Sequence, residues 1–422
     1  MKSNIKIKIK VLAKLLFCKN FLNLLPQGYK HEKMANNECQ KMGNLSLLMP
    51  RKRLPLGKKT KPAQAGRLLW FFWPLPSLTV NHFRAFIVCF QFSILCLSGC
   101  YFHNTEFVPS PNGFHNANDF PLSNEQITGF AGNGEKLVAV SYEGNIAWSE
   151  DSGVSWDIVE TGNITDNFID GIHFNAVTYG NGFFLAAGDL GKAAYSKDGL
   201  NWQAGIIGPM SPKNILCVAA GALRGRPVFT AAGTDGRMAH AVDSPEGPWF
   251  MADQVPFGTA QDYGEAIHAL AFGEIKGNGV FVAVGDNGRI GILKDLSGKW
   301  YCGRTASHET YRSVTYGNDR FIAVGDNGMI KFSLDPINYT WITVKDDTLG
   351  LRSFMGITFD PLIKNFVLYT SDTALAFSEF GDSWNAAHFN ALFANNELIS
   401  ALGCTSKRII IGSNIGSVFY SN

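Results

Sequence analysis

Short apolar segments alternate with tight polar turns along most of the second half of the chain. The stretch from Phe281 to Ile290 reads FVAVGDNGRI, and the stretch from Phe321 to Ile330 reads FIAVGDNGMI. In both, an apolar run suited to a β-strand ends in an Asp-Asn-Gly turn and a second apolar run follows, which predicts a β-hairpin. A repeat of this length at one spacing indicates a modular fold.

Five weaker copies of the same unit begin at Leu137, Phe184, Phe229, Phe366 and Ile409. The residues that close the seven turns are Gly144, Gly191, Gly236, Gly288, Gly328, Thr373 and Gly416. Their successive spacings are 47, 45, 52, 40, 45 and 43 residues, which is the size of one propeller blade.

The units also hold a short apolar segment before the hairpin, such as Asn175–Gly182, and in all but the last unit a tryptophan follows the hairpin. The tryptophans are Trp156, Trp202, Trp249, Trp300, Trp341 and Trp384. We interpret the first segment as an inner strand and the tryptophan as the mark of an outer, fourth strand. Residues 127–422 are therefore predicted to form an all-β, seven-bladed β-propeller of four-stranded antiparallel blades. A solenoid of the same period is the alternative.

The last unit ends at Asn422, directly after its third strand, and has no tryptophan strand of its own. We hypothesise that an extended piece between Phe107 and Leu122 supplies the missing strand. Such a strand would join the first blade to the last and cover an exposed sheet edge.

The chain has two parts of unlike charge. Residues 1–99 hold 17 Lys/Arg against 2 Asp/Glu, a balance of +15, and residues 100–422 hold 20 against 33, a balance of −13. A strongly acidic propeller is a poor partner for nucleic acid.

An apolar run from Ala85 to Ser98 follows Arg84 at the junction of these two parts. Its 14 residues are too few to span a bilayer but suit the core of a secretory signal. The sequence Leu97-Ser98-Gly99-Cys100 resembles the bacterial lipobox, which implies lipidation of Cys100 and cleavage before it.

This resemblance sets the expected domain organisation. Residues 80–99 would be a lipoprotein signal peptide, and residues 100–126 a lipidated tether with the ring-closing strand. Because signals usually occupy 15–30 residues, we expect residues 1–79 to lie upstream of the true translation start. The mature protein is then expected to be an exported, membrane-anchored bacterial lipoprotein, at the outer membrane or cell surface rather than the inner membrane.

A second motif, S-x-D-x-G-x-x-W, recurs after the third strand of the units and resembles the Asp-box of BNR-repeat propellers in the sialidase superfamily. Its members in the first copy and in a one-residue-shorter second copy are Ser149, Asp151, Gly153, Trp156, Ser196, Asp198, Gly199 and Trp202. The resemblance implies a structural role, with the aspartate accepting backbone N–H bonds in a turn away from the ligand face.

A candidate ligand face lies at the opposite end, where the second-to-third-strand turns gather. Six of these turns carry an acidic residue, namely Glu143, Asp189, Asp235, Asp286, Asp326 and Asp372. Four arginines share that end: Arg237, Arg289, Arg312 and Arg352. The acidic ring could attract a cation or a basic surface, and guanidinium groups suit a carboxylate. Tight-turn geometry and surface salt bridges explain the same residues without any ligand.

The resemblance to sialidases makes hydrolysis of terminal sialic acids the alternative function, because those enzymes bind the substrate carboxylate with three arginines beside a tyrosine–glutamate pair. Tyr263, Glu265 and Tyr311 lie near the starts of inner strands. The arginine motif common near the N-terminus of sialidases is absent, and the first two units hold no arginine at the candidate face.

No other catalytic motif is present, and neither the histidines nor Cys217, Cys302 and Cys404 show a metal-ligand spacing. We therefore predict no cofactor, no metal and no catalytic residue. The expected function is non-enzymatic binding or scaffolding, with an envelope protein, a host protein or a glycan as the partner.

Overall fold

The computed structural model describes residues 113–117, 119–160, 164–165, 173–256, 264–305, 308–388, 393 and 396–422. The predicted signal peptide, the segment before it and the lipidation site Cys100 lie outside the described residues. So does Tyr263.

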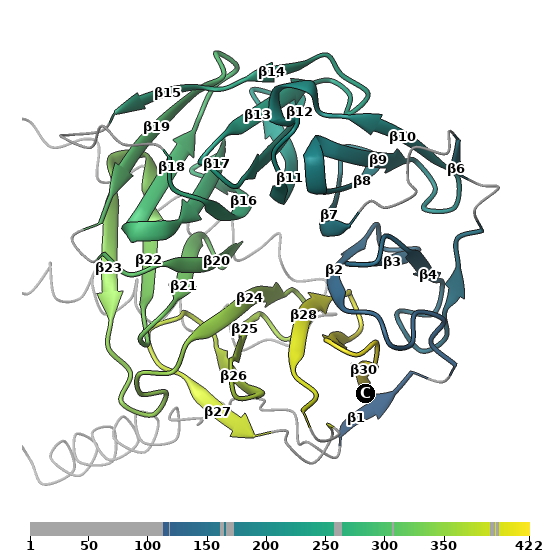
Figure 1. Cartoon of the computed structure of the whole chain (residues 1–422). Coiled ribbons are helices and arrows are strands. Elements are labelled where there is room, and N and C mark those ends of the chain that lie inside the picture. Colours follow the sequence, from purple (N-terminus) through teal and green to yellow (C-terminus); the bar gives the residue numbers. More distant parts are fainter. Residues whose placement is uncertain are drawn as a thin grey trace, which may run out of the picture. The chain divides into compact units, whose positions relative to one another are not determined.

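Seven antiparallel sheets follow one another around a ring, as predicted, and neighbouring inner strands contact each other (Figure 1). We number the sheets as blades 1 to 7 in the order of their inner strands. From inner to outer, the strands of blade 1 are β2 (Ile127–Gly132), β3 (Leu137–Ser141), β4 (Ile146–Ser149) and β5 (Asp157–Ile158). Those of blade 2 are β7 (Phe174–Gly180), β8 (Phe183–Gly188), β9 (Lys192–Ser196) and β10 (Trp202–Ile206). Those of blade 3 are β11 (Ile215–Leu223), β12 (Arg226–Gly233), β13 (Met238–Val242) and β14 (Trp249–Met251).

Blades 4 to 6 repeat this order. Their strands are β16 (Ile267–Ile275), β17 (Asn278–Gly285), β18 (Arg289–Leu293) and β19 (Lys299–Arg304); β20 (Tyr311–Gly317), β21 (Arg320–Gly325), β22 (Ile330–Asp335) and β23 (Thr340–Val344); and β24 (Phe354–Asp360), β25 (Asn365–Thr370), β26 (Ala374–Ser378) and β27 (Asn385–His388). Each predicted tryptophan immediately precedes an outer strand or is its first or second residue.

Blade 7 takes its outer strand from the other end of the described chain. Its first three strands are β28 (Ile399–Cys404), β29 (Ile409–Ser413) and β30 (Val418–Ser421), and β1 (Phe114–Asn116) pairs antiparallel with β30. Phe114 lies opposite Ser421, and the backbone bond from Asn422 N to Gly113 O, 3.0 Å long, extends the pairing. This strand falls inside the segment in which the sequence suggested ring closure, and it covers the edge that β30 would otherwise expose.

Two blades gain a fifth strand that the sequence did not reveal. The strand β6 (Ile164–Thr165) pairs parallel with β10 in blade 2, and β15 (Asp253–Pro256) pairs parallel with β19 in blade 4. Both extra strands come from the long connections between blades and cover an outer edge. In the described part of the chain, single-turn 3₁₀ helices occupy the loops Asp189–Gly191, Gly208–Met210, Asp286–Gly288 and Pro336–Asn338.

The repeat turns are built on positive φ angles. In the turns of blades 4 and 5 the second residue, Asn287 or Asn327, has a φ of 53° or 56°. The glycine that follows has a φ of 71° in one turn and 72° in the other. Asparagine and glycine tolerate this left-handed region better than other residues, which explains the recurrent Asp-Asn-Gly sequence.

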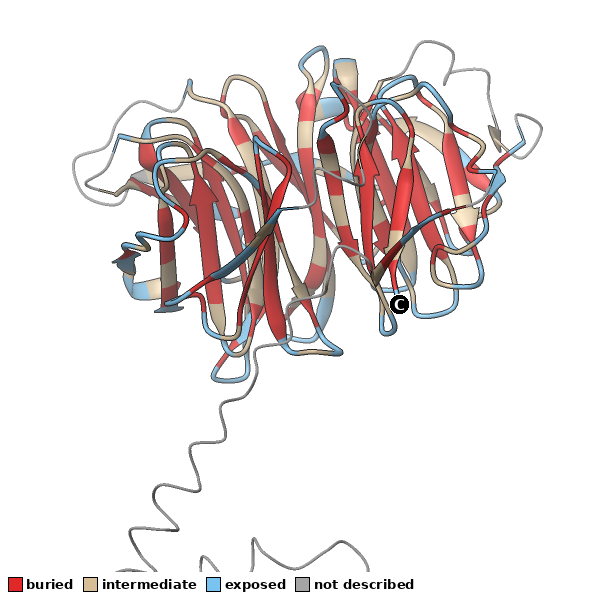
Figure 2. Ribbon diagram, turned by 90° about the horizontal axis from the view of Figure 1, so that it is seen from below, coloured by how far each residue is buried: buried red, intermediate tan, exposed pale blue. Residues whose placement is uncertain are grey.

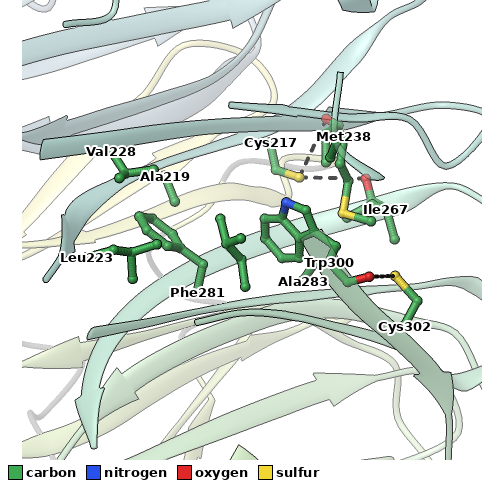
Figure 3. Packing of buried hydrophobic residues seen from close by; sticks show 13 residues of the cluster. Cys217, Ala219, Leu223, Val228, Met238, Ile267, Phe281, Ala283, Trp300 and Cys302 are labelled. Atoms are coloured by element: carbon green, nitrogen blue, oxygen red, sulfur yellow. Dashed lines mark hydrogen bonds between the residues drawn. The ribbon is translucent and has the colours of Figure 1, made fainter. Parts of the chain in front are cut away.

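The core is divided among the seven blade-to-blade contacts, each of which holds one buried apolar cluster. Figure 3 shows the cluster between blades 3 and 4, where Trp300 and Phe281 of blade 4 pack beside Cys217 and Leu223 of blade 3. In Figure 2 the buried residues follow the strands and the exposed ones collect at the loops. In the described part of the chain, no helix is long and apolar enough to span a membrane.

Candidate functional site

The seven turns between the second and third strands lie at the same end of the ring as the loops that enter the inner strands. In every blade, the first residue of this turn donates its N–H to the carbonyl just before the inner strand. The seven donors are Tyr142, Asp189, Thr234, Asp286, Asp326, Ser371 and Asn414, with N···O distances of 2.9–3.1 Å. We call this end of the propeller the turn face, and the end that carries the other two sets of turns the opposite face.

Each inner strand has a β-bulge where it leaves the turn face, because the register skips its second residue. A bulge redirects the side chain of the extra residue. Three bulged side chains reach the backbone of the next blade: Thr128 Oγ1 donates to Phe174 O at 2.8 Å, and Asn175 Nδ2 donates to Ile215 O at 2.9 Å. Ser400 Oγ donates to a carbonyl of blade 1 at 2.6 Å. These bonds link neighbouring blades.

A fourth bulged residue, Arg312 of blade 5, forms a two-point ion pair with Asp326 in the turn of the same blade. Nε lies 2.6 Å from Oδ1 and Nη2 lies 2.9 Å from Oδ2. Partial burial alone would raise the pKa of Asp326, but the bonds and charge of Arg312 outweigh it, and this pKa is lowered. These two residues of the candidate ligand face therefore form an internal ion pair.

Two more of the predicted arginines are also paired with turn carboxylates. Arg352 Nε lies 2.9 Å from an oxygen of Asp372, and Arg237 Nε lies 3.3 Å from an oxygen of Asp235. The same Asp235 oxygen is 3.6 Å from Lys213 Nζ. Three of the six acidic turn residues thus pair with lysine or arginine side chains on the turn face.

The prediction that Arg289 is available to a ligand is wrong. Arg289 is only 1% exposed and lies beneath the turn face at the start of β18. Its guanidinium donates to Glu265 O at 2.8 Å, to Gly236 O at 3.5 Å and to the side chain of Gln254. The guanidinium therefore ties blade 4 to blade 3, and its planar set of donors suits that role.

The described contacts give no support to the sialidase alternative. That mechanism needs guanidinium groups open to a substrate carboxylate and an accessible tyrosine. Tyr311 is fully buried, and its hydroxyl bonds to Thr305 Oγ1 at 2.9 Å. The Glu265 carboxylate accepts from Arg304 and from Asn287 Nδ2.

The remaining acidic turn residues accept hydrogen bonds from side chains or backbone, and none of them pairs with a lysine or arginine among the described residues. Asp189 accepts from Asn175 Nδ2 at 2.9 Å, and Glu143 accepts from Gln126 N at 3.1 Å. Asp286 lies 2.8 Å from His268 Nε2, and Thr310 Oγ1 donates to it at 3.1 Å.

Exposed apolar side chains form the part of the turn face that sequence analysis missed. They are Tyr142, Leu190, Leu351, Met355, Leu398 and Ile415. Leu351 is 83% exposed. Leu190 gave a signal in the sequence, because it stands in the turn position that asparagine occupies in blades 4 and 5. Its φ is 59°, a conformation that costs leucine roughly 1–2 kcal/mol.

The Asp-box-like turns lie on the opposite face and are closed by their own side chains. Asp151 Oδ1 accepts from Val154 N and Ser155 N, both at 2.9 Å, and Trp156 Nε1 donates to Gly153 O at 3.0 Å. Ser149 Oγ donates to Asp151 Oδ1 at 2.8 Å.

The second copy of the motif has the same contacts. Ser196 Oγ accepts from Gly199 N at 2.9 Å, and Trp202 Nε1 donates to Gly199 O at 3.0 Å. Partial burial would raise the pKa of Asp198, but N–H bonds from Asn201 and Leu200 lower it to about 2.

A groove of about 650 Å³ also lies on the opposite face, between blades 4 and 5. Phe272, Tyr316 and Leu334 line it, and the Tyr316 hydroxyl donates to the Glu274 carbonyl. Among the described residues, no group of three or more possible metal ligands occurs. The three described cysteines are free thiols.

Comparison with known proteins identifies a fold but no family. No protein-family model matches the chain, and no curated protein matches it. A solved structure titled "YCF48 bound to D1 peptide" is 14% identical over 74% of this chain and 95% of that chain, with a TM-score of 0.56. YCF48 from Cyanidioschyzon merolae is 12% identical over 74% and 98%, with a TM-score of 0.55.

The WD40 β-propeller domain of Doa1 is 15% identical over 74% of this chain and 97% of that chain, with a TM-score of 0.51. At such identities these likenesses show the propeller fold alone. The turn face is defined by the hydrogen bonds and burial of this chain alone.

Proposed function

We propose that this protein is an exported lipoprotein, anchored to a membrane through Cys100, whose propeller binds a segment of another protein on its turn face and catalyses no reaction. The hydrogen bonding and exposure of the side chains on the turn face support this proposal. Its predicted arginines already bond to acceptors within the protein, while six apolar side chains remain exposed there. Exposed apolar side chains that gather on one surface are typical of a protein-binding site.

The distribution of these side chains favours one face over the other. Among the described residues, the exposed large apolar side chains of the opposite face are Leu334, Leu362 and Phe380, half the number found on the turn face. The Asp-box-like turns also occupy the opposite face, and their polar groups are bonded within each turn. The turn face is therefore the better platform for a partner.

A rigid, internally paired face suits binding better than catalysis. An enzyme needs charged groups that converge on a small site and remain able to meet substrate. Here the ion pairs hold the loops in place, and a partner can contact the apolar side chains without breaking them. The solved structure titled "YCF48 bound to D1 peptide" is a propeller of similar fold in complex with a peptide, which is consistent with this proposal.

Site-specific photo-cross-linking tests which face binds. A benzophenone amino acid is placed at Leu351 or Leu398 on the turn face, and at Leu362 or Leu334 as exposed controls on the opposite face. In intact cells, irradiation should give a discrete adduct with another protein at the first pair and not at the second. Adducts at the control positions alone, or at none of the four, would overturn the proposal.

The anchor is tested separately by mass and fractionation. The native protein should begin at Cys100 and carry the added mass of acyl chains, because the four residues ending there resemble a lipobox. A Cys100→Ser variant should leave the membrane fraction while keeping the melting temperature of the propeller. An unmodified residue 100 in the membrane-bound protein would contradict the lipid anchor.

A further inference from the structure

Hydrogen bonds and a ring contact link the loops that carry four exposed apolar residues of blades 7, 1 and 2 on the turn face. Leu398 N donates to the Asn414 side chain at 2.7 Å, and the next residue, Ile415, accepts from Asn124 N at 2.9 Å. Gln126, two residues after Asn124, accepts from Tyr142 N in the turn of blade 1 at 2.9 Å. We call the surface made by Leu398, Ile415, Tyr142 and Leu190 the apolar arc.

The second half of the arc is joined through a stacked ring pair. Tyr142 stacks on His173 with ring centroids 4.2 Å apart and an interplanar angle of 9°. His173 Nδ1 lies 2.5 Å from the Tyr142 carbonyl, and the His173 carbonyl accepts from Asp189 N at 3.0 Å. Leu190 follows Asp189 and is 51% exposed. The four members of the arc are exposed by 40–51%, so a partner can cover each of them.

Three carboxylates lie beside the arc, and Lys192 follows Leu190 by two residues. Glu125 accepts from Asn145 Nδ2 at 2.8 Å, Glu143 accepts from Gln126 N, and Asp189 accepts from Asn175 Nδ2. Between described residues, none of these three carboxylates takes part in a salt bridge. The arginines of the turn face belong to blades 3 to 6 and already have acceptors there.

These carboxylates favour a cationic ligand over an anionic one at the arc. An anionic segment would bring like charges together at Glu143 and Asp189, which disfavours binding. A cationic segment would compensate both carboxylates, and a lysine or arginine over the exposed ring of Tyr142 would add a cation–π contact. We propose, on the basis of the function proposed above, that the apolar arc binds a protein segment in which apolar residues are interspersed with lysine or arginine.

The experiment uses the purified full-length protein and three fluorescein-labelled peptides, in which leucine alternates with lysine, glutamate or serine. Fluorescence anisotropy should show that the lysine peptide binds most tightly and that its affinity falls as salt is raised. The double variant Glu143→Gln with Asp189→Asn should weaken this binding roughly threefold to tenfold, given the usual strength of exposed charge pairs. Both substitutions keep an oxygen acceptor for the native hydrogen bond.

The matched control is Glu135→Gln, which removes one negative charge from an exposed turn on the opposite face. It should leave the affinity for the lysine peptide unchanged. A Leu190→Asn variant should weaken all three peptides, because it removes an apolar contact while asparagine suits the local φ of 59°. Melting temperatures close to that of the wild type verify that the variants are folded.

The outcomes separate the charge inference from the proposed function. Binding of the glutamate peptide as tightly as the lysine peptide, or equal weakening by the control variant, would overturn the cationic partner while leaving a binding face. Absence of binding by all three peptides at millimolar concentration would count against the apolar arc as a docking surface, and the cross-linking experiment would then decide whether any partner binds the turn face.

Discussion

Closure of the ring by β1 gives the most quantitative prediction. Phe114, the first residue of this strand, is 5% exposed and lies in the apolar cluster between blades 6 and 7. Replacing a buried phenylalanine with alanine typically costs about 3–5 kcal/mol, because both apolar burial and packing are lost. With an unfolding entropy of about 2 cal/mol/K per residue, a propeller of this size loses about 1.5 °C of melting temperature per kcal/mol. Phe114→Ala should therefore lower the melting temperature by about 5 °C or more.

The control is Asn116→Ala in the same strand. Asn116 is exposed, so its substitution should change stability by no more than about 0.5 kcal/mol. Differential scanning calorimetry of the purified protein measures both. Removal of all residues before Ser123 should be more damaging than either, since it also deletes the β1–β30 pairing and the buried Leu122. Equal melting temperatures for the two point variants would refute the role of β1 in closing the ring.

Two further predictions concern packing and pH. A Cβ added to Gly273 would lie 2.3 Å from the Tyr316 ring of the next blade, so Gly273→Ala should lower the free energy of unfolding by about 1–3 kcal/mol. A Cβ added to Gly208 would have no atom within 4 Å, so Gly208→Ala should not destabilise the protein. Chemical denaturation measures both variants, and equal denaturation midpoints would contradict the prediction. The folded-state pKa of Asp198 is depressed to about 2, so its stabilisation is present above the ordinary value near 4 and is lost as pH falls toward 2. The melting temperature of the wild type should therefore exceed that of Asp198→Asn at neutral pH and approach it near pH 2, and a gap that does not change with pH would contradict the assignment.

The fold was predictable because most blades have their own local sequence signals. The Asp-Asn-Gly turns need positive φ, and the tryptophans mark outer strands, so both signals can be read within one unit. The parallel strands β6 and β15 were not predictable from the sequence. They are short segments of the connections between blades, and they pair because the folded chain places them beside β10 and β19.

The turn face was predictable in its location but not in its chemistry. The acidic residues and three of the arginines do lie there, yet their pairing depends on the bulge in each inner strand, which changes where a side chain such as Arg312 points. Arg289 follows a turn in the sequence as Arg237 does, but only the structure shows that it is buried against the preceding blade. Leu190 and Ile415 are exposed apolar residues with a local signal in the sequence, because each stands before the closing glycine of its turn, where blades 4 and 5 have asparagine.

Binding of another protein to the turn face can be measured by comparing two exposed leucines. A photo-reactive residue at Leu398 lies on the turn face, and one at Leu362, of similar exposure, lies on the opposite face. We expect a discrete cross-linked adduct in cells from Leu398 and none from Leu362. An adduct from Leu362 without one from Leu398 would show that the turn face is not the binding surface.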